Sequence, residues 1–385
     1  MGKNRNDREL WQFIDRKKFD ALADKWDVDK WVRELKTWEL TCALLTLMTH
    51  RLSTYREVEQ TLDIPRSTFG DALVNRYYGF FEDLCDMLLL DIRGRTRDRK
   101  IKRAIREILA IDSTECRVHG SLFSTPGWRP THSKGHQAMV KLHVVWNIEG
   151  EWIEDFIITG ARRHDSPVSL QFELQTNKMY VFDRAYNDVT FWLKIIDVGS
   201  HFVTRLKDHS IALLKDGKKA EATEEEGVLY DGIYKPNPQT LVNAGISKDR
   251  REDVQFRYIV YRDPETKKVF YFVTSDFKSS AQSIAETYKR RWAVELLFRW
   301  LKGHLDIRYL ESRDTNAVRI QLAAAVLTQL LLQLKKISEK YDGTLWELLC
   351  SIRTELIRES LSRRDSPGDC RWKSASRRSY RKAAA

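Results

Sequence analysis

Apolar residues recur at helical spacing through the first 107 residues of the chain. Two sets show the spacing clearly, Leu10, Phe13, Ile14, Phe19 and Leu22, and then Trp38, Leu40, Leu44, Leu45 and Met48. Intervals of three and four residues place apolar side chains on one face of a helix. Residues 1–107 are therefore predicted to form an all-α N-terminal domain.

One turn in this region resembles a helix-turn-helix. A helix is expected to end near Leu62, a turn to include Pro65, and Ser67 to cap a second helix that carries Arg66 and Arg76. Ordinary helical bundles contain the same kind of turn. DNA reading and plain packing both remain open for this segment.

From residue 108 to 207 the apolar pattern changes to that of strands. The run ILAI leads into Asp112, two alternating runs meet at a turn around Gly150, and MYVF leads into Asp183. A short helix is expected after Pro167, and a longer one closed by Gly199 precedes a last strand, HFVTRLK. Three strands, a helix, a strand, a helix and a strand predict a mixed α/β sheet.

The pattern changes again at residue 208. Short alternating runs separated by charged turns predict a mostly antiparallel β insertion over 208–280. A helix capped by Ser279 or Ser280 is expected to follow. The apolar run 319–337 predicts a helix that serves as core or as an interface, and 337–385 holds a further helix and a basic tail.

The run from Tyr288 to Lys302 is apolar in most directions when it is wound as one helix. Its polar and aromatic members fall within one arc of roughly 100°: Tyr288, Arg291, Trp292, Glu295, Arg299 and Lys302. A solvated face with Arg–Glu pairs one turn apart is the ordinary interpretation. Because so little other surface on this helix is polar, we interpret the stripe as a site.

The charge balance favours a polyanionic partner. Among 385 residues, Lys plus Arg exceeds Asp plus Glu by 66 − 55 = 11, with a sequence pI of about 9.3. The basic run 93–106 carries more cations than a linker needs, which predicts phosphate contact. Cations and aromatic residues at 257, 258, 261 and 262 suggest that the insertion reaches toward DNA: Arg257, Tyr258, Tyr261 and Arg262.

Other features narrow the class of protein. Five scattered cysteines without a CxxC pair indicate a reducing compartment, and the first residues lack the apolar core of a signal peptide. The apolar runs look too short or too polar to span a bilayer, so a cytoplasmic protein without a membrane partner is expected. The sequence contains no GxxxxGK[ST] phosphate-binding loop, so a nucleotide cofactor is not expected.

Three carboxylates are the candidates for chemistry. Asp112 and Asp183 follow buried strands, and Glu295 is the only acid on the stripe. A buried charge needs a counter-ion, and carboxylate oxygens are the ligands that Mg²⁺ prefers. Two such ions can drive phosphoryl transfer. The alternative is that each Asp only caps a turn.

The stripe also carries a family signature. Tyr288, Arg291, Glu295 and Lys302 fit Tyr-x2-Arg-x3-Glu-x6-Lys, and AID and FDRAY surround the two aspartates. The chain thereby resembles the insertion sequence 4 family of bacterial DDE transposases. The resemblance implies an RNase H-like core with a β insertion, and a metal-binding catalytic triad for two Mg²⁺ ions, with Mn²⁺ as a substitute: Asp112, Asp183 and Glu295.

The resemblance also implies a reaction and partners. Members of the family cut double-stranded DNA at the ends of their element and join the 3′ ends to a target, in several cases through a DNA hairpin. Phosphate contacts near the cleaved end would come from Tyr288, Arg291, Arg299 and Lys302, with Trp292 supporting a flipped base. The aromatic residue that receives this base would lie in the insertion, where the candidates are Phe270, Tyr271 and Phe272. Synapsis of two ends implies a homodimer associated with the nucleoid.

The expected division of the chain follows from these elements. A helical DNA-binding domain (1–107) precedes the first part of the core (108–207), the insertion (208–280), the second part of the core with the catalytic helix (281–336), and a C-terminal region (337–385). The helices after residue 313 are the expected dimer interface.

Two other interpretations compete with the DNA transposase. One is a non-catalytic, domesticated DNA-binding transposase, and the other is a structure-selective nuclease on the same fold. A separate group of residues has a spacing that only superficially suggests a zinc site, because the group holds one thiol and no second one: Cys116, His119, His132 and His136. His119 and His164 are better explained as surface or hydrogen-bonded histidines.

Overall fold

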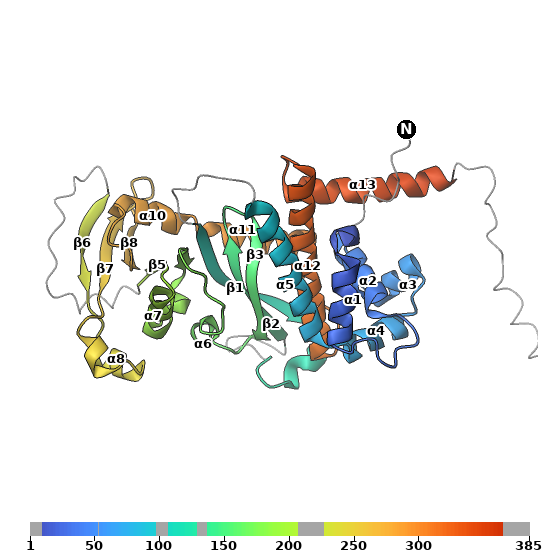
Figure 1. Cartoon of the computed structure of the whole chain (residues 1–385), viewed down its shortest axis with the longest axis horizontal. Helices are drawn as coiled ribbons and strands as arrows, with labels where there is room; N and C mark the ends of the chain where they lie inside the picture. The colour runs from blue at the N-terminus through green and yellow to red at the C-terminus, as the bar shows by residue number, and fades with distance from the viewer. Residues whose placement is uncertain (1–9, 53, 98–106, 129–136, 207–226, 365–385) are drawn as a thin grey trace, which may run out of the picture.

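The computed structural model describes residues 10–52, 54–97, 107–128, 137–206 and 227–364, with side chains to residue 354. The molecule is elongated, with a helical N-terminal part at one end and strands β6 to β8 at the other (Figure 1). Within the described residues, nine strands form one sheet in the order β3-β2-β1-β4-β5-β8-β7-β6, with β9 beside β1.

The N-terminal part is all-α, as predicted. Its apolar faces are buried in one core, and an Asp15 cap and a Thr54–Glu57 capping box fix the starts of two helices. The elements are η1 (Leu10–Phe13), α1 (Arg16–Lys25), α2 (Thr37–His50), α3 (Tyr55–Leu62), α4 (Arg66–Asn75) and α5 (Tyr78–Arg97).

The predicted helix-turn-helix corresponds to α3 and α4, but two details differ. Ser67 is not the cap, because α4 begins at Arg66 after Pro65 and no side chain caps it. Arg76 is buried, and its guanidinium donates to the Thr37 hydroxyl and the Leu35 carbonyl. Arg76 therefore packs the domain internally and is not available to read DNA.

The first five strands confirm the RNase H-like fold. β1 pairs antiparallel with β2, which pairs antiparallel with β3, while β4 and β5 run parallel to β1. Their bounds are β1 (Ile108–Val118), β2 (Ala138–Asn147), β3 (Trp152–Gly160), β4 (Met179–Phe182) and β5 (His201–Arg205). The hairpin expected at Gly150 joins β2 and β3.

Two elements of the core differ from the sequence prediction. β1 does not end at Asp112 but continues for six residues, because Thr114, Cys116 and Val118 keep one face of the strand buried. The short helix α6 (Asp165–Ser169) begins before Pro167 rather than after it. α7 (Val189–Asp197) ends before Gly199, as predicted, and η2 (Gly120–Ser124) and η3 (Arg184–Tyr186) are short turns.

The insertion extends the core sheet instead of forming a separate unit. Its strands are antiparallel, as predicted, and β8 pairs with β5 from Val203 to Arg205. Two short helices lie between its strands. The elements are β6 (Val228–Tyr234), α8 (Pro238–Asn243), α9 (Lys248–Arg251), β7 (Phe256–Arg262) and β8 (Val269–Thr274). The charged turns predicted between 207 and 226 lie outside the described residues.

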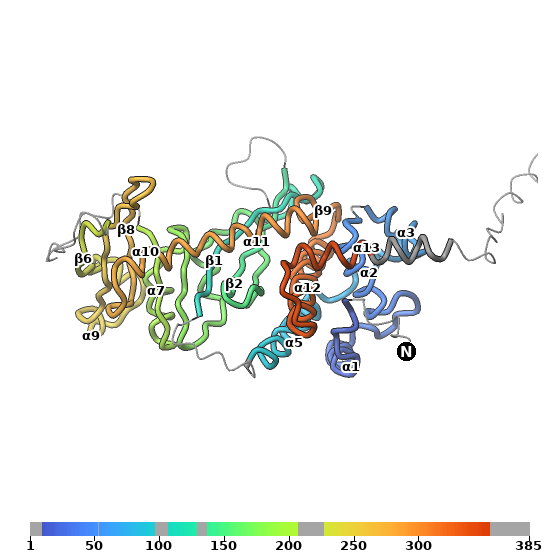
Figure 2. Tube along the Cα trace, turned by 90° about the horizontal axis from the view of Figure 1, so that it is seen from above, coloured from blue at the N-terminus to red at the C-terminus, as the bar shows by residue number. Residues whose placement is uncertain are grey.

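Opposite faces of the sheet carry two separate cores. One core holds Ile111 and Phe182 with α6 and α7, and the other holds Ala110 and Val181 with α10 (Ala281–Lys289) and α11 (Trp292–His304). α10 and α11 follow each other along the sheet from β8 toward β9 (Tyr309–Leu310) (Figure 2). The alternation of side chains along a strand thus sets which residues can face α11.

α12 (Thr315–Glu339) joins the helical part to the sheet. It packs against α2 and α5 of the helical part and against β3 of the sheet. In Figure 1 it stands between α2 and the sheet. This helix is long and apolar enough to cross a membrane, contrary to the expectation from the length of its apolar run, but 94% of its apolar window is buried inside the molecule. α12 is therefore core rather than a dimer interface, which leaves α13 (Leu345–Arg364) among the helices after residue 313.

Candidate active site

Strand register places the two aspartates side by side. Ile111 of β1 pairs with Phe182 of β4 in a parallel ladder, so Asp112 and Asp183 are the next residues along neighbouring strands. Ile111 and Phe182 point into the core under α7, and the following residues therefore face the opposite side, toward α11. Asp183 also caps η3 by accepting from the Ala185 amide at 2.7 Å, so the turn interpretation holds for it as well.

The helix expected from Ala281 onward is interrupted at Arg290 and Arg291. The Arg291 amide donates to the Tyr288 carbonyl, three residues back instead of four, and the Arg290 amide is shared between the carbonyls three and four residues back. Arg290 forms an ion pair with Glu149 at 2.8 Å, which ties the interruption to the β2–β3 turn. The sequence predicted that this helix is apolar, and therefore packed, on most of its sides. One of these apolar residues, Leu296, is instead 47% exposed.

Arg291 connects two of the three carboxylates. Its Nη1 lies 2.8 Å from Asp112 Oδ2, and its Nη2 lies 2.5 Å from Glu295 Oε1. The three side chains are only 16% to 31% exposed. The Tyr288 ring lies 5.8 Å from the guanidinium carbon. The structure thus brings Tyr288, Arg291 and Glu295 of the signature next to Asp112.

Asp112 lies in the electrostatic field of the two other carboxylates, Asp183 and Glu295. Burial raises the pKa of Asp112 to about 6, and the charges of Asp183 and Glu295 add to the rise. The Ser113 amide and the Arg291 guanidinium act in the opposite direction on this pKa. A cation near Asp112 would therefore relieve an unfavourable concentration of negative charge.

The donor set fits Mg²⁺ by its chemistry, since all three groups are hard carboxylate oxygens. Among the residues that the structure describes, no three His, Cys, Asp or Glu side chains stand close enough together to hold an ion as they are. Arg291 lies between two of the carboxylates. Ion binding at Asp112, Asp183 and Glu295 would thus require the side chains to close as Arg291 moves aside.

The remaining residues of the stripe differ in exposure. Trp292 is 50% exposed, and the Arg299 guanidinium lies 5.9 Å from its ring. Lys302 is half-buried one helical turn further on, where its charge acts on the Cys116 thiol of β1. Trp292 comes before Glu295 on α11, and Arg299 and Lys302 come after it.

An aromatic hollow of about 210 Å³ lies beside this surface. The rings of Phe270 and Phe272 are stacked in it with centroids 5.9 Å apart, and the Arg205 guanidinium lies 5.0 Å from the Phe270 ring. The full lining is Arg205, Tyr261, Phe270, Phe272, Ala285, Tyr288, Lys289, Arg291 and Trp292. Of the three aromatic candidates, Phe270 and Phe272 reach this hollow, whereas Tyr271 packs in the core on the other face.

Sequence reasoning missed Arg205, because nothing in the run HFVTRLK indicates that β8 would pair with β5. It also assigned Arg257 and Tyr258 to a DNA-facing surface, which the structure contradicts. Arg257 is buried in an ion pair with Asp231 at 2.6 Å, and Tyr258 is buried in the core.

The zinc interpretation receives no support from the described residues. Cys116 is buried, and His119 Nδ1 accepts a hydrogen bond from the Ser121 amide. His164 is exposed at the start of α6. His132 and His136 lie outside the described residues.

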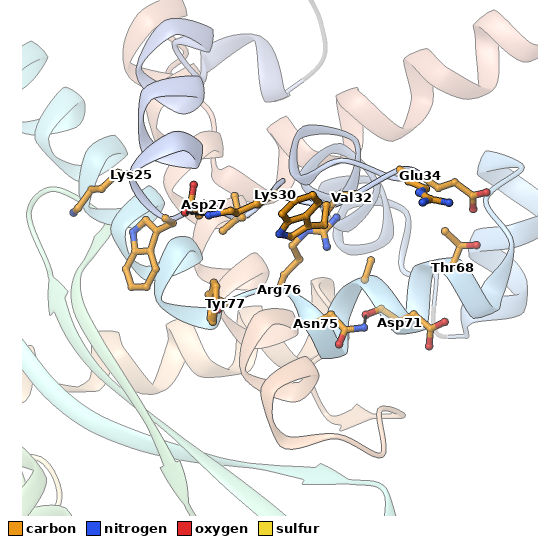
Figure 3. Close-up of a pocket in the computed structure, with 15 residues that line it drawn as sticks. Lys25, Asp27, Lys30, Val32, Glu34, Thr68, Asp71, Asn75, Arg76 and Tyr77 are labelled. Atoms are coloured by element: carbon orange, nitrogen blue, oxygen red, sulfur yellow. Dashed lines mark hydrogen bonds and ion pairs between the residues drawn. The ribbon is translucent and has the colours of Figure 1, made fainter.

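A larger hollow of about 990 Å³ lies in the helical N-terminal part (Figure 3). One wall is the loop after α1, where Trp31 is 90% exposed and has a left-handed φ of 67°. The other wall is the polar face of α4, formed by Thr68, Asp71 and Asn75 (Figure 3). Trp31 is thus an exposed aromatic side chain on the wall of this hollow.

The chain also matches two known protein families. The model of the transposase DDE domain family matches residues 103–331, which is more than half of the chain and includes all three carboxylates. The chain belongs to this family. A second family model, a domain of unknown function, matches residues 8–67 of the helical part.

Curated relatives agree with the family assignment. The chain is 30% identical over 240 residues to a putative transposase of Sinorhizobium fredii, y4zB, covering 62% of this chain and 63% of the relative. It is 30% identical over 239 residues to the probable transposase of insertion sequence element IS5377 of Geobacillus stearothermophilus, covering 61% and 59%. The matched region thus spans about three fifths of either relative.

Two further similarities complete the comparison. The chain is 24% identical over 292 residues to a putative transposase of insertion sequence element IS4SA of Synechocystis, covering 75% of this chain and 77% of the relative. The insertion sequence 4 resemblance noted from the sequence is thereby confirmed. A solved structure of a piggyBac transposase synaptic complex with hairpin DNA aligns with a TM-score of 0.47 at 11% identity, over 94% of this chain and 83% of that one.

Proposed function

We propose that the chain is a DNA transposase that cuts and joins DNA strands with divalent metal ions held by Asp112, Asp183 and Glu295. The observation that carries the proposal is the register of β1 and β4, which sets two aspartates side by side and facing the helix that bears Glu295. Bound Mg²⁺ would supply activation of the attacking oxygen and stabilisation of the leaving one. Mn²⁺ is the expected substitute.

The side chains around the carboxylates suit a DNA end. Tyr288 and Arg291 would meet the phosphate at the reacting bond, and the two carboxylate contacts of the planar Arg291 guanidinium support this role. Arg299 and Lys302 extend positive charge along α11, where the following phosphates would lie. Trp292 offers an exposed aromatic surface at the rim.

The aromatic hollow suits one unstacked base. A base that leaves the duplex needs an aromatic surface and a nearby cation. Phe270 supplies the ring, Arg205 lies above it, and Trp292 borders the opening. This arrangement supports excision through a DNA hairpin, because hairpin formation requires a distorted end.

The helical part is proposed to bind the duplex away from the cleaved end. Polar side chains on α4 can hydrogen-bond to base edges, and Trp31 and Arg33 line the same hollow. Two chains acting on two ends would form a homodimer, for which α13 is the remaining candidate among the C-terminal helices.

The proposal is tested with purified protein and a duplex that carries an end of the element. Cleavage in Mg²⁺ is expected for the wild type and is expected to be lost in Asp112→Asn, Asp183→Asn and Glu295→Gln while DNA binding remains. Joining of the freed 3′ end to a second duplex separates a transposase from a nuclease on the same fold. Cleavage by any one of the three variants at the wild-type rate would exclude the catalytic triad.

A further inference from the structure

A polar cluster lies behind Asp112, on the face of the sheet opposite α11. Asp165, in the first turn of α6, accepts from the Ser113 hydroxyl at 3.1 Å and from Lys141 Nζ at 3.2 Å. His143 is fully buried beside it, with Nδ1 3.5 Å from the carboxylate. The side chains of Asp165 and Lys141 are only 17% and 14% exposed. The proposed chemistry uses none of these four residues directly.

Ser113 links this cluster to the carboxylate site. Its amide donates to Asp112 Oδ1 at 2.8 Å, while its hydroxyl donates to Asp165 on the other face. Asp112 Oδ2 continues the connection to Arg291. A single hydrogen-bonded chain therefore runs through the sheet, from Asp165 through Ser113 and Asp112 to Arg291.

Helix α6, which carries Asp165, also contacts the segment after Asp183. Ser166 of α6 donates to Asp188 at 3.0 Å, and Asp188 caps α7. The buried Tyr186 of η3 has Asp165, Asp112 and Asp183 as charged neighbours, and burial raises its pKa well above the ordinary value. α6 thus contacts residues that come shortly after each of the two aspartates in the chain.

An ordinary buried ion pair could explain Lys141 and Asp165 alone. It does not explain why the Asp165 carboxylate also accepts a hydrogen bond from the hydroxyl of Ser113, the residue next to Asp112. Burial lowers the pKa of His143 to about 4, so this imidazole is neutral near pH 7 and Lys141 supplies the positive charge. Groups that hold metal ligands from behind in this way fix their orientation.

We propose that Asp165 is a positioning residue which, through Ser113, holds Asp112 beside Asp183 in the geometry that binds a divalent cation. The inference rests on the proposed metal site. Removing the carboxylate would leave the ligands in place but free to rotate. The expected loss is therefore in metal affinity, on the order of tenfold or more.

The test measures Mn²⁺ binding to the full chain. Electron paramagnetic resonance reports the concentration of free Mn²⁺ during the titration. Asp165→Asn and Ser113→Ala are expected to weaken Mn²⁺ binding, while Ser113→Thr, which retains the hydroxyl, binds as the wild type does. Asp231→Asn is the matched control, because it breaks the Asp231–Arg257 pair, with side chains 27% and 10% exposed, at a distance from the site. It is expected to lower the melting temperature without changing Mn²⁺ affinity.

The outcomes separate this inference from the function on which it rests. Unchanged Mn²⁺ affinity in Ser113→Ala, together with weakened binding in Asp112→Asn, overturns the role of Asp165 and keeps the metal site. Unchanged affinity in Asp112→Asn as well overturns the metal site itself. Because Ser113→Ala removes only one hydroxyl, the test does not depend on whether Asp165→Asn folds.

Discussion

Arg291 Nη1 lies 2.8 Å from Asp112 Oδ2, although 179 positions separate the two residues in the chain. The contact joins the first strand of the sheet to the start of α11. It neutralises part of the charge at Asp112 while Arg291 also binds Glu295. In the proposed reaction this guanidinium exchanges carboxylates for a DNA phosphate, which leaves the carboxylates to the metal.

Replacing Arg291 by Gln is expected to destabilise the protein when no metal is present. The change leaves the partly buried Asp112 and Glu295 without their shared cation, at a cost of about 1–3 kcal/mol. Mg²⁺ should raise the melting temperature of this variant more than that of the wild type. Differential scanning calorimetry with and without Mg²⁺ measures both effects.

Arg290→Gln is the control for that change. It removes the neighbouring guanidinium and its ion pair with Glu149. The Arg290 side chain is 42% exposed, compared with 16% for Arg291. A smaller loss of stability and no additional response to Mg²⁺ are expected. An equal Mg²⁺ response in the two variants would contradict the role given to Arg291.

The pKa of Asp112 predicts how metal binding depends on pH. Burial raises this pKa to about 6, so Asp112 is ionised above pH 6 and protonated below it. A proton competes with the cation, and Mn²⁺ affinity is expected to fall by up to about tenfold per pH unit below 6. Titrations between pH 5 and 8 measure the dependence, and Asp112→Asn should flatten it.

The aromatic hollow predicts a substrate effect. Phe270→Ala is expected to slow cleavage of an intact duplex end by about tenfold or more, because base–aromatic stacking contributes about 1–3 kcal/mol. A set of duplexes is then made in which each lacks one base, at successive positions near the end. The wild type and Phe270→Ala should cut at equal rates the duplex that lacks the base that flips. Tyr271→Phe, on the other face of the strand, serves as the control. A deficit that persists on every abasic duplex would argue against a flipped base.

Asp155 predicts a stability change away from the site. Burial raises its pKa to about 7, with Asp86 and Glu173 adding to the rise. Its folded-state pKa lies above the unfolded one, so its contribution to stability is present below about pH 3.8 and is lost as pH rises through 7. Asp155→Asn is therefore expected to stabilise the protein at pH 8 by on the order of 1 kcal/mol, and by less at pH 6.

Thermal unfolding at the two pH values checks this prediction. Asp197→Asn is the matched control, because its ion pair with Arg250 is about half-exposed and should be worth little. The control is expected to change the melting temperature slightly and equally at both pH values. Destabilisation by Asp155→Asn at pH 8 would show that the carboxylate is needed there in its charged form.

Local periodicity predicted much of the fold. The alternation of apolar residues gave the strands of the core and their order, and helical spacing gave α2, α7 and α12. The interruption at Arg290 and Arg291 could not be predicted, because both residues are compatible with a continuous helix and their ion-pair partners, Glu149 and Asp112, are distant in the sequence. The end of β1 was misplaced for a related reason, since a polar Asp112 within a strand looks like its boundary.

Long-range pairing limited the prediction of the site. The signature that runs from α10 into α11 identified Tyr288, Arg291 and Glu295, and the structure brings them near Asp112. Arg205 was missed, and Arg257 was assigned wrongly, because both depend on how the insertion joins the core sheet. β8 pairs with β5 through contacts that neither segment encodes by itself.

Replacement of Asp183 by Cys tests the central claim most directly. A thiolate is a poor ligand for Mg²⁺ but accepts softer divalent ions. If Asp183 binds the metal, Asp183→Cys should bind the duplex end, fail to cut it in Mg²⁺, and regain cleavage in Mn²⁺. Cleavage in Mg²⁺ at the wild-type rate would contradict the account.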